Sequence, residues 1–296
     1  MPTETWQHGF AHTNGLRLHY VEQGEGPLMI LLHGFPEFWY SWRYQIPVLN
    51  QHFHVVAPDL RGYSDSDKPE GVEQYQLPSL VKDVRGLLHC FGQQKAIIVG
   101  HDWGAAVAWT FAAKHPEATE RLIVCSIPHL GVFRKMAGQS FVEHYPALQR
   151  LFYIFFFRVP EVPERFFSKD NYAFFDAYRL INPNRFTPEV IAEYKKAIGK
   201  PGALTAGLNY YRANLPAEVL VGEVPLLEEK VTRPTLFMYG ENEQFVSRSV
   251  AEWTREFVEA PFTFRPIPQC GHCVQQEEPE VVNQAIMEFL ADLKGD

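Results

Sequence analysis

The sequence has few of the features that mark disulfide-rich, membrane-spanning or secreted proteins. Its 296 residues include only four cysteines, too few for a disulfide framework in a chain of this length. No run reaches the about 18 uninterrupted apolar residues of a membrane span, and the first residues lack the basic and apolar regions of a signal peptide. We therefore expect a cytoplasmic protein without a membrane span.

Basic residues are also scarce. The chain has 27 Lys and Arg against 35 Asp and Glu, a formal net charge of -8, whereas a phosphate-binding surface needs clustered positive charge. The hydrophobic fraction of 46% and the charged fraction of 21% are those of an ordinary globular protein. Nucleic acid is therefore not an expected partner, and the length allows one large domain or a core with an insertion.

Apolar runs typical of buried strands alternate with amphipathic stretches typical of helices. Strands are predicted at residues 27–32, 53–57, 96–99, 121–125, 234–239 and 262–265, and helices near residues 39–50, 78–92, 247–258 and 279–293. This alternation indicates an α/β fold with a mostly parallel central sheet and helices on both faces.

The alternation stops in the middle of the chain. Residues 130–224 are rich in aromatics and prolines, with helical segments and no clear strand. Most of these aromatics are expected to form the segment's own core. We predict a first core part at residues 1–129, an inserted helical cap at 130–224 and a second core part at 225–296.

A candidate nucleophile lies between a predicted strand and a helix of small residues. Gly100-His101-Asp102-Trp103-Gly104 has the Gly-x-nucleophile-x-Gly spacing of a sharp strand-to-helix turn, with Asp in the nucleophile's position. A carboxylate needs no base at neutral pH and can attack an sp³ carbon to form an ester. The simpler interpretation of Asp102 is a helix N-cap.

The expected partners of such a nucleophile follow in order along the chain. Glu241 and Glu243 come after the strand at 234–239, and His272 lies in a glycine-bounded loop after the strand at 262–265. Either glutamate could orient His272, and spacing does not decide between them. We expect His272 to activate water for hydrolysis of the ester.

The loop His33-Gly34-Phe35-Pro36 follows the strand at 27–32, at the position that contributes one backbone N–H to an oxyanion site. With the N–H of Trp103, the N–H of Phe35 is expected to stabilise the charge that develops when water attacks the ester. His33 is expected to make structural hydrogen bonds within this loop.

Three motifs together resemble the α/β-hydrolase-fold epoxide hydrolases, and the similarity extends from about residue 9 to about residue 290. The motifs are His33-Gly34-Phe35-Pro36-Glu37, Asp59-Leu60-Arg61-Gly62-Tyr63 and Gly100-His101-Asp102-Trp103-Gly104. The resemblance implies an α/β-hydrolase fold and conversion of an epoxide to a vicinal diol through an Asp102 ester. It implies no cofactor and no metal.

The resemblance also implies roles for other residues. Two cap tyrosines that bind and protonate the epoxide oxygen match Tyr153 and Tyr211, although the adjacent Tyr210 is an alternative to Tyr211. Phe35, Trp103, Tyr153 and Tyr211 are the implied substrate-binding residues. The family's acid is the last residue of a Gly-Glu-x-Asp pattern, which selects Glu243, but this chain has Glu where the family has Asp. It also has Cys273 where relatives commonly have a large aromatic residue.

Two other functions are compatible with the same fold. A haloalkane or haloacetate dehalogenase uses the same nucleophile, but residues 130–224 contain no tryptophan to bind halide, and residues 103–107 contain no arginine to bind a carboxylate. A non-catalytic ligand-binding protein on the same fold would not need the full catalytic set. Cys270 and Cys273 form a C-x-x-C that suggests a thioredoxin-like oxidoreductase, but they lie in the C-terminal His272 loop rather than after an early strand.

The expected substrate is a small apolar epoxide, because the aromatic cap favours apolar ligands. The protein is expected to be a monomer or a homodimer. For the two cysteines beside His272, two hypotheses remain: an oxidant-sensitive pair that disturbs the His272 loop, or two buried apolar side chains.

Overall fold

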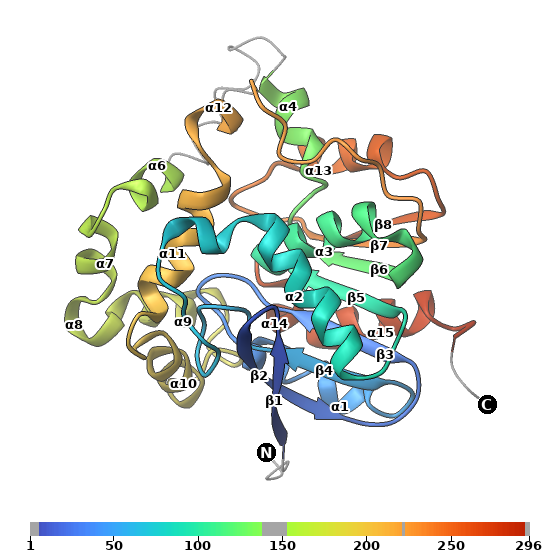
Figure 1. Cartoon of the computed structure of the whole chain (residues 1–296), viewed down its shortest axis with the longest axis horizontal. Helices are drawn as coiled ribbons and strands as arrows, with labels where there is room; N and C mark the ends of the chain where they lie inside the picture. Colours follow the sequence, from blue (N-terminus) through green and yellow to red (C-terminus); the bar gives the residue numbers. More distant parts are fainter. Residues whose placement is uncertain (1–5, 138–152, 221–222, 294–296) are drawn as a thin grey trace.

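In the computed structural model, which describes residues 6–137, 153–220 and 223–293, an eight-stranded sheet forms the centre of the molecule (Figure 1). The strand order is β1-β2-β4-β3-β5-β6-β7-β8. The strands are β1 (Gln7–Thr13), β2 (Leu16–Gln23), β3 (Leu28–Leu32), β4 (His54–Pro58), β5 (Ala96–His101), β6 (Thr119–Cys125), β7 (Thr235–Gly240) and β8 (Phe262–Ile267).

Strands β3 to β8 pair in parallel, whereas β1, β2 and β4 pair antiparallel at one side of the sheet. Every residue of β3, β5 and β7 is buried. Parallel strands covered on both faces have continuous apolar runs, which is why these strands stand out in the sequence. The predicted mostly parallel sheet is confirmed. The antiparallel β1–β2 hairpin was not predicted.

Helices cover both faces of the sheet. In Figure 1, α2 (Leu77–Cys90) and α3 (Trp103–Lys114) lie in front of it, and α1 (Ile46–Leu49) and α15 (Pro279–Phe289) lie behind. The smaller helices of the core are η1 (Trp39–Trp42), η2 (Val72–Tyr75), η3 (Pro116–Ala118), α13 (Arg248–Glu252), η5 (Trp253–Phe257) and α14 (Val274–Glu277).

The stretch predicted to be helical near residues 39–50 is helical in the structure but not continuous. The structure has two short pieces, η1 and α1, and Pro47 lies in the first turn of α1. Proline is compatible with the first turn of a helix but not with its interior. A continuous helix through this segment is therefore disfavoured, and a second helix starts at Ile46.

The chain between β6 and β7 is helical, and no strand occurs in the residues described there. Its helices are α4 (Gly131–Ala137), α6 (Tyr153–Arg158), α7 (Val162–Phe167), α8 (Lys169–Tyr172), η4 (Ala173–Ala177), α9 (Tyr178–Ile181), α10 (Pro188–Ile198), α11 (Ala203–Asn214) and α12 (Ala217–Leu220). We call these helices the cap. The domain boundaries at residues 129/130 and 224/225 stay a prediction.

Buried polar contacts fix helix α11 to the core. The Tyr210 hydroxyl donates to the carbonyl oxygen of Arg61 at 2.8 Å. The Asn214 side chain accepts from the Leu77 N–H at 2.8 Å and donates to the Tyr75 carbonyl oxygen at 2.9 Å. Buried polar groups are costly when unpaired, so moving α11 would break these hydrogen bonds. The contacts therefore hold α11 in one position over the core.

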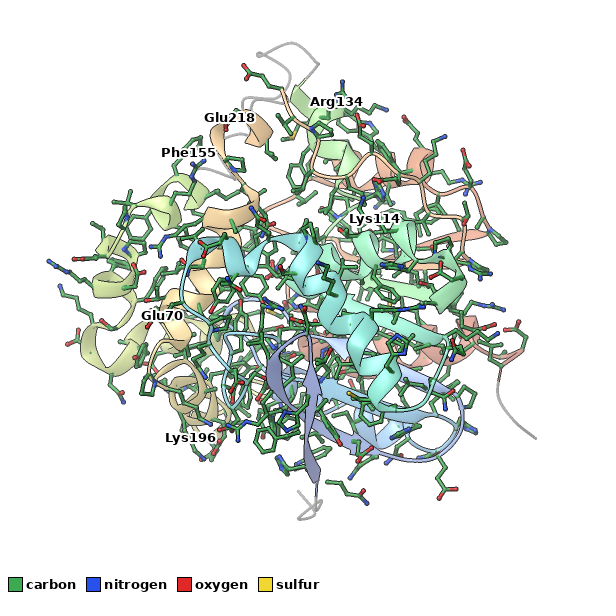
Figure 2. All side chains as sticks on the ribbon, viewed as in Figure 1. Glu70, Lys114, Arg134, Phe155, Lys196 and Glu218 are labelled. Atoms are coloured by element: carbon green, nitrogen blue, oxygen red, sulfur yellow. The ribbon has the colours of Figure 1, made fainter. Side chains whose placement is uncertain are left out.

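Side chains pack around the sheet and helices (Figure 2), and Glu70 and Lys114, which are labelled there, are exposed. Within the described ranges, each helix is too short or too polar to cross a bilayer.

Candidate active site

Asp102 occupies a strained turn between β5 and α3. Its backbone has φ 51° and ψ -118°, a conformation that L-residues rarely adopt. The flanking glycines allow it. A Cβ on Gly104 would lie 2.1 Å from the Leu32 carbonyl oxygen, and one on Gly100 would lie 2.3 Å from the Gly104 carbonyl oxygen. The turn therefore requires glycine at both positions.

The two carboxylate oxygens of Asp102 have different neighbours. The Phe35 N–H donates to Oδ1 at 2.8 Å, and His272 Nε2 lies 3.5 Å from Oδ2. Burial would raise the pKa of Asp102, but the hydrogen bond to His272 and the charges of His272 and His101 hold this pKa below its usual value. Asp102 is therefore a carboxylate at neutral pH. Trp103 follows as the first residue of α3, where the helix does not use the backbone N–H.

Of the two candidate acids, Glu243 contacts His272. Glu243 Oε2 lies 2.7 Å from His272 Nδ1, and the Glu243 side chain is fully buried. Glu241 instead pairs with Arg248 at the surface, 2.8 Å away. Burial would lower the pKa of His272, but the negative charges of Glu243 and Asp102 raise it well above its usual value.

The second oxygen of Glu243 is also bonded, because Oε1 accepts the Phe245 N–H at 2.8 Å. The carboxylate thus links its own loop to the His272 ring. This arrangement fixes the Glu243 side chain, which is one methylene longer than the aspartate of the family pattern.

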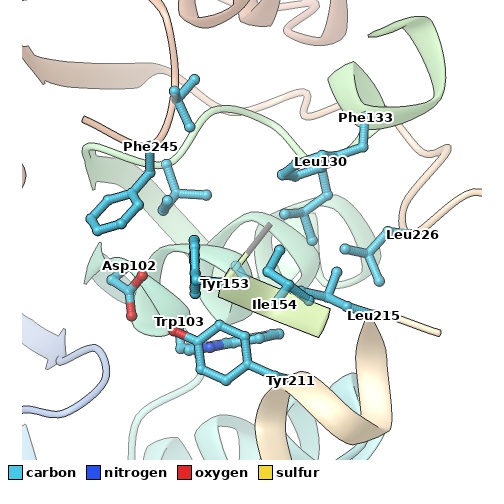
Figure 3. Close-up of a pocket in the computed structure, with 13 residues that line it drawn as sticks. Asp102, Trp103, Leu130, Phe133, Tyr153, Ile154, Tyr211, Leu215, Leu226 and Phe245 are labelled. Carbon is cyan, nitrogen blue, oxygen red and sulfur yellow. The ribbon is translucent and has the colours of Figure 1, made fainter. Parts of the chain in front are cut away.

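Tyr153 on α6 and Tyr211 on α11 lie near Asp102 in the lining of one cavity (Figure 3). Their rings lie 6.1 Å apart, and a hydrogen bond joins their side chains. Burial and the nearby charge of Asp102 raise the pKa of each phenol, so both are protonated at neutral pH. Tyr210 points elsewhere, since its hydroxyl is bound to the Arg61 carbonyl oxygen.

An apolar cavity opens beside these groups (Figure 3). Asp102, Trp103, Tyr153 and Tyr211 lie at one end of it. The other lining residues are apolar: Ala106, Ile127, Leu130, Phe133, Ile154, Leu215, Leu226, Phe245 and Val246. Phe35 packs against this site, with its ring 5.6 Å from that of Tyr211. Such a cavity suits an apolar ligand with one polar end.

Phe245 was not predicted from the sequence, yet it separates two cavities. Its ring lies 5.2 Å from that of Tyr153 and 4.9 Å from that of His272. A second cavity begins at Phe245 and His272 and is lined partly by polar side chains, including Gln244 and Gln269. His272 therefore faces a more polar space than the one beside Tyr153. In the sequence, the only feature that could have indicated a role for Phe245 was its position two residues after Glu243.

A buried ion pair beneath the site was also missed. His101 Nδ1 lies 2.9 Å from Glu37 Oε2, and His101 Nε2 lies 2.9 Å from the carbonyl oxygen of His272. Both neighbours are hydrogen-bond acceptors, so each ring nitrogen of His101 faces an acceptor. Burial would raise the pKa of Glu37, but His101 and the Gly34 N–H hold it below its usual value.

A metal ion does not fit this pair. Donor atoms of Glu37, His101 and Cys273 lie within 4.8 Å of one another. Metal binding requires a lone pair on the imidazole, but both nitrogens of His101 are bonded to acceptors. The cluster is therefore a hydrogen-bonded network.

His33 makes structural contacts. Its Nδ1 lies 2.8 Å from the Gly34 carbonyl oxygen, and its Nε2 accepts the Leu60 N–H at 3.0 Å. The ring thereby joins the loop after β3 to the loop after β4.

Comparisons with known proteins agree with this geometry. A family model described as alpha/beta hydrolase fold matches residues 27–279. The chain is 40% identical over 287 residues to the AB hydrolase superfamily protein YfhM of Bacillus subtilis (strain 168), covering 95% of this chain and 96% of that protein. It is 37% identical over 288 residues to Epoxide hydrolase 4 of Homo sapiens, covering 94% of this chain and 77% of that protein.

Solved structures show the same similarity. The Bacillus megaterium epoxide hydrolase in complex with an inhibitor superposes with a TM-score of 0.86 at 30% sequence identity. The match covers 96% of this chain and all of that chain.

The state of the cysteines generates a first prediction. Cys125, Cys270 and Cys273 are free and buried, whereas Cys90 is exposed, and burial raises the pKa of the Cys270 and Cys273 thiols. Because the thiolate is the reactive form, we expect an aromatic disulfide reagent to modify Cys90 alone in the native protein. All four cysteines should react after unfolding.

The number of reactive cysteines is measured from the thiolate that the reagent releases, and an assay of epoxide turnover measures activity. Activity should persist after Cys90 is modified. Rapid modification of a second thiol with loss of activity, abolished in Cys273→Ser, would instead support the oxidant-sensitive pair.

Proposed function

This chain belongs to the α/β-hydrolase-fold family and is an epoxide hydrolase, and we propose that it opens an apolar epoxide through an ester to Asp102. One observation carries the proposal. An ionised carboxylate at a strained turn lies beside two protonated phenols at one end of an apolar cavity, and His272, paired with Glu243, lies next to this carboxylate.

In the first step, Asp102 attacks a ring carbon of the epoxide and the bond from that carbon to the epoxide oxygen breaks. Oδ2 is the attacking atom, because Oδ1 is bound by the Phe35 N–H. Tyr153 and Tyr211 hydrogen-bond the epoxide oxygen, and one of them transfers its proton to the alkoxide. An alkoxide is more basic than a phenolate, so this transfer is favourable.

In the second step, His272 removes a proton from water, and the hydroxide attacks Cγ of the ester. Negative charge then develops on Oδ1, which the Phe35 N–H already contacts, and we expect the Trp103 N–H to stabilise this charge as well. The ester bond breaks, the departing oxygen takes the proton from His272, and the diol leaves. The carboxylic acid of Asp102 then loses its proton and the tyrosine phenolate gains one, so both groups return to their starting states.

The substrate class follows from the cavity lining. Apart from Asp102, the two phenols and Trp103, the lining side chains are apolar, so the epoxide's substituents gain from burial. A small apolar epoxide is the best fit. A cytoplasmic location and a monomeric or homodimeric state stay predictions.

Loss of the base should trap the ester. In His272→Gln, the first step needs only Asp102 and the tyrosines, so a stoichiometric adduct with the mass of the whole epoxide should accumulate on the peptide containing Asp102. Intact-protein and peptide mass spectrometry measure it. The double variant His272→Gln/Asp102→Ala should stay unlabelled. Absence of the adduct, with wild-type turnover shown on the same epoxide, would refute the ester.

The two phenols should act on the first step. We expect Tyr153→Phe and Tyr211→Phe each to slow ester formation, and the double variant to slow it by about 10²- to 10⁴-fold, the usual contribution of general acid catalysis. Rapid-quench kinetics measures the step. Tyr210→Phe is the matched control, since it removes the hydrogen bond to Arg61. It should cost about 1 kcal/mol of stability and leave ester formation close to wild type.

The charge of Glu243 raises the pKa of His272, which gives a prediction for pH dependence. A base acts in its neutral form, so ester hydrolysis speeds up as pH rises through this pKa. Glu243→Gln removes the charge and lowers the pKa, so the acid limb of the profile should move to lower pH while the plateau rate falls. Glu241→Gln, at the Arg248 pair, should leave the profile unchanged. An unmoved acid limb in Glu243→Gln would show that Glu243 does not set this pKa.

A further inference from the structure

A second group of possible metal ligands lies away from the reaction, where the β1–β2 hairpin meets the loop after β4. Donor atoms of His19, Asp59 and Asp65 lie within 4.8 Å of one another. His8 adds a further imidazole, with its Nδ1 2.9 Å from His19 Nε2. Two imidazoles and a partly exposed carboxylate are the ligands that zinc prefers in proteins.

The His19 ring is oriented by a buried carboxylate. Its Nδ1 lies 2.8 Å from Asp59 Oδ2, and because a carboxylate only accepts, Nδ1 carries the proton. Nε2 of His19 is therefore the free nitrogen, and it faces His8. A buried carboxylate that holds one nitrogen of a histidine and leaves the other available is the usual support of a metal-binding histidine.

Two nitrogens face each other at 2.9 Å, Nδ1 of His8 and Nε2 of His19. At this distance only one of them can carry a proton. That proton can move to the outer nitrogen of His8, which is exposed on β1. This distinguishes the pair from His101, whose nitrogens both face acceptors.

A surface cavity gives access to these groups. It is lined by His8, His19 and Asp65, and also by Glu193 and Lys196 of α10. Lys196 lies at the outer surface of the molecule (Figure 2). Asp65 pairs with Lys200 through Oδ1, so its second oxygen can approach a cation. An ion can therefore enter from solvent without opening the core.

We propose that His8, His19 and Asp65 bind a divalent transition-metal ion such as Zn²⁺, with Asp59 holding His19 in position. Zinc binds imidazole nitrogen at about 2.0–2.1 Å, so the exposed His8 ring, whose Nδ1 lies 2.9 Å from His19 Nε2, has to move to seat the ion. The ion would join β1, β2 and the loop of Asp65. The site is structural and independent of epoxide turnover.

Zinc titration of the whole protein tests the site. Calorimetry with ZnCl₂ should show a single Zn²⁺ bound per chain, and the melting temperature should rise with Zn²⁺ concentration, because a ligand of the folded state stabilises it. Co²⁺ should bind in the same place with visible absorption and without a sulfur-to-cobalt band, which excludes binding at Cys90.

Matched variants locate the ion. His8→Gln and Asp65→Asn should each weaken Zn²⁺ binding by about 10-fold or more. His12→Gln removes another exposed histidine of β1 and should leave it unchanged. Binding in His8→Gln equal to that of the wild type, no stoichiometric Zn²⁺ binding, or a thiolate band with Co²⁺ would each overturn the proposal.

Discussion

The ion pair between Glu37 and His101 is the contact on which the geometry of the active site depends. Glu37 accepts the Gly34 N–H at 3.1 Å, and His101 donates to the carbonyl oxygen of His272 at 2.9 Å. The pair therefore connects the loop of Phe35, the turn of Asp102 and the loop of His272. Gln276 adds a further donor to Glu37 at 2.7 Å. Buried charges are costly unless their hydrogen bonds are satisfied. These hydrogen bonds therefore hold the three loops in one arrangement.

The sheet and the cap contribute different side chains to the site. Loops at the carboxyl ends of parallel strands supply the carboxylate and the base, the usual position of ligand sites in α/β sheets, and the cap supplies the phenols. The adjacent tyrosines of α11 have different contacts, because successive residues of a helix point about 100° apart. Tyr210 is bound to the core through the Arg61 carbonyl oxygen, whereas Tyr211 lines the apolar cavity.

The sequence predicted those parts of the molecule whose physical signal is local. Strands buried on both faces are continuous apolar runs, so β3, β5 and β7 were visible, whereas β1 lies at the sheet's edge with mostly exposed side chains and lacks that signal. The turn of Asp102 was visible because its strain requires glycine at fixed positions. The Glu37–His101 pair depends on residues far apart in the chain, and neither residue type is informative alone. Spacing alone left Glu241 and Glu243 open, and the family resemblance selected Glu243, whose carboxylate lies 2.7 Å from His272 in the structure.

The glutamate in place of aspartate is explained by the same loop. A longer side chain would swing more freely, but Glu243 is held at both oxygens, by His272 at Oε2 and by the Phe245 N–H at Oε1. The second bond also fixes Phe245, whose ring lies between the apolar cavity beside Tyr153 and the more polar cavity beside His272. In the proposed mechanism, Glu243 would therefore both orient His272 and position Phe245, the side chain between the epoxide cavity and the more polar cavity.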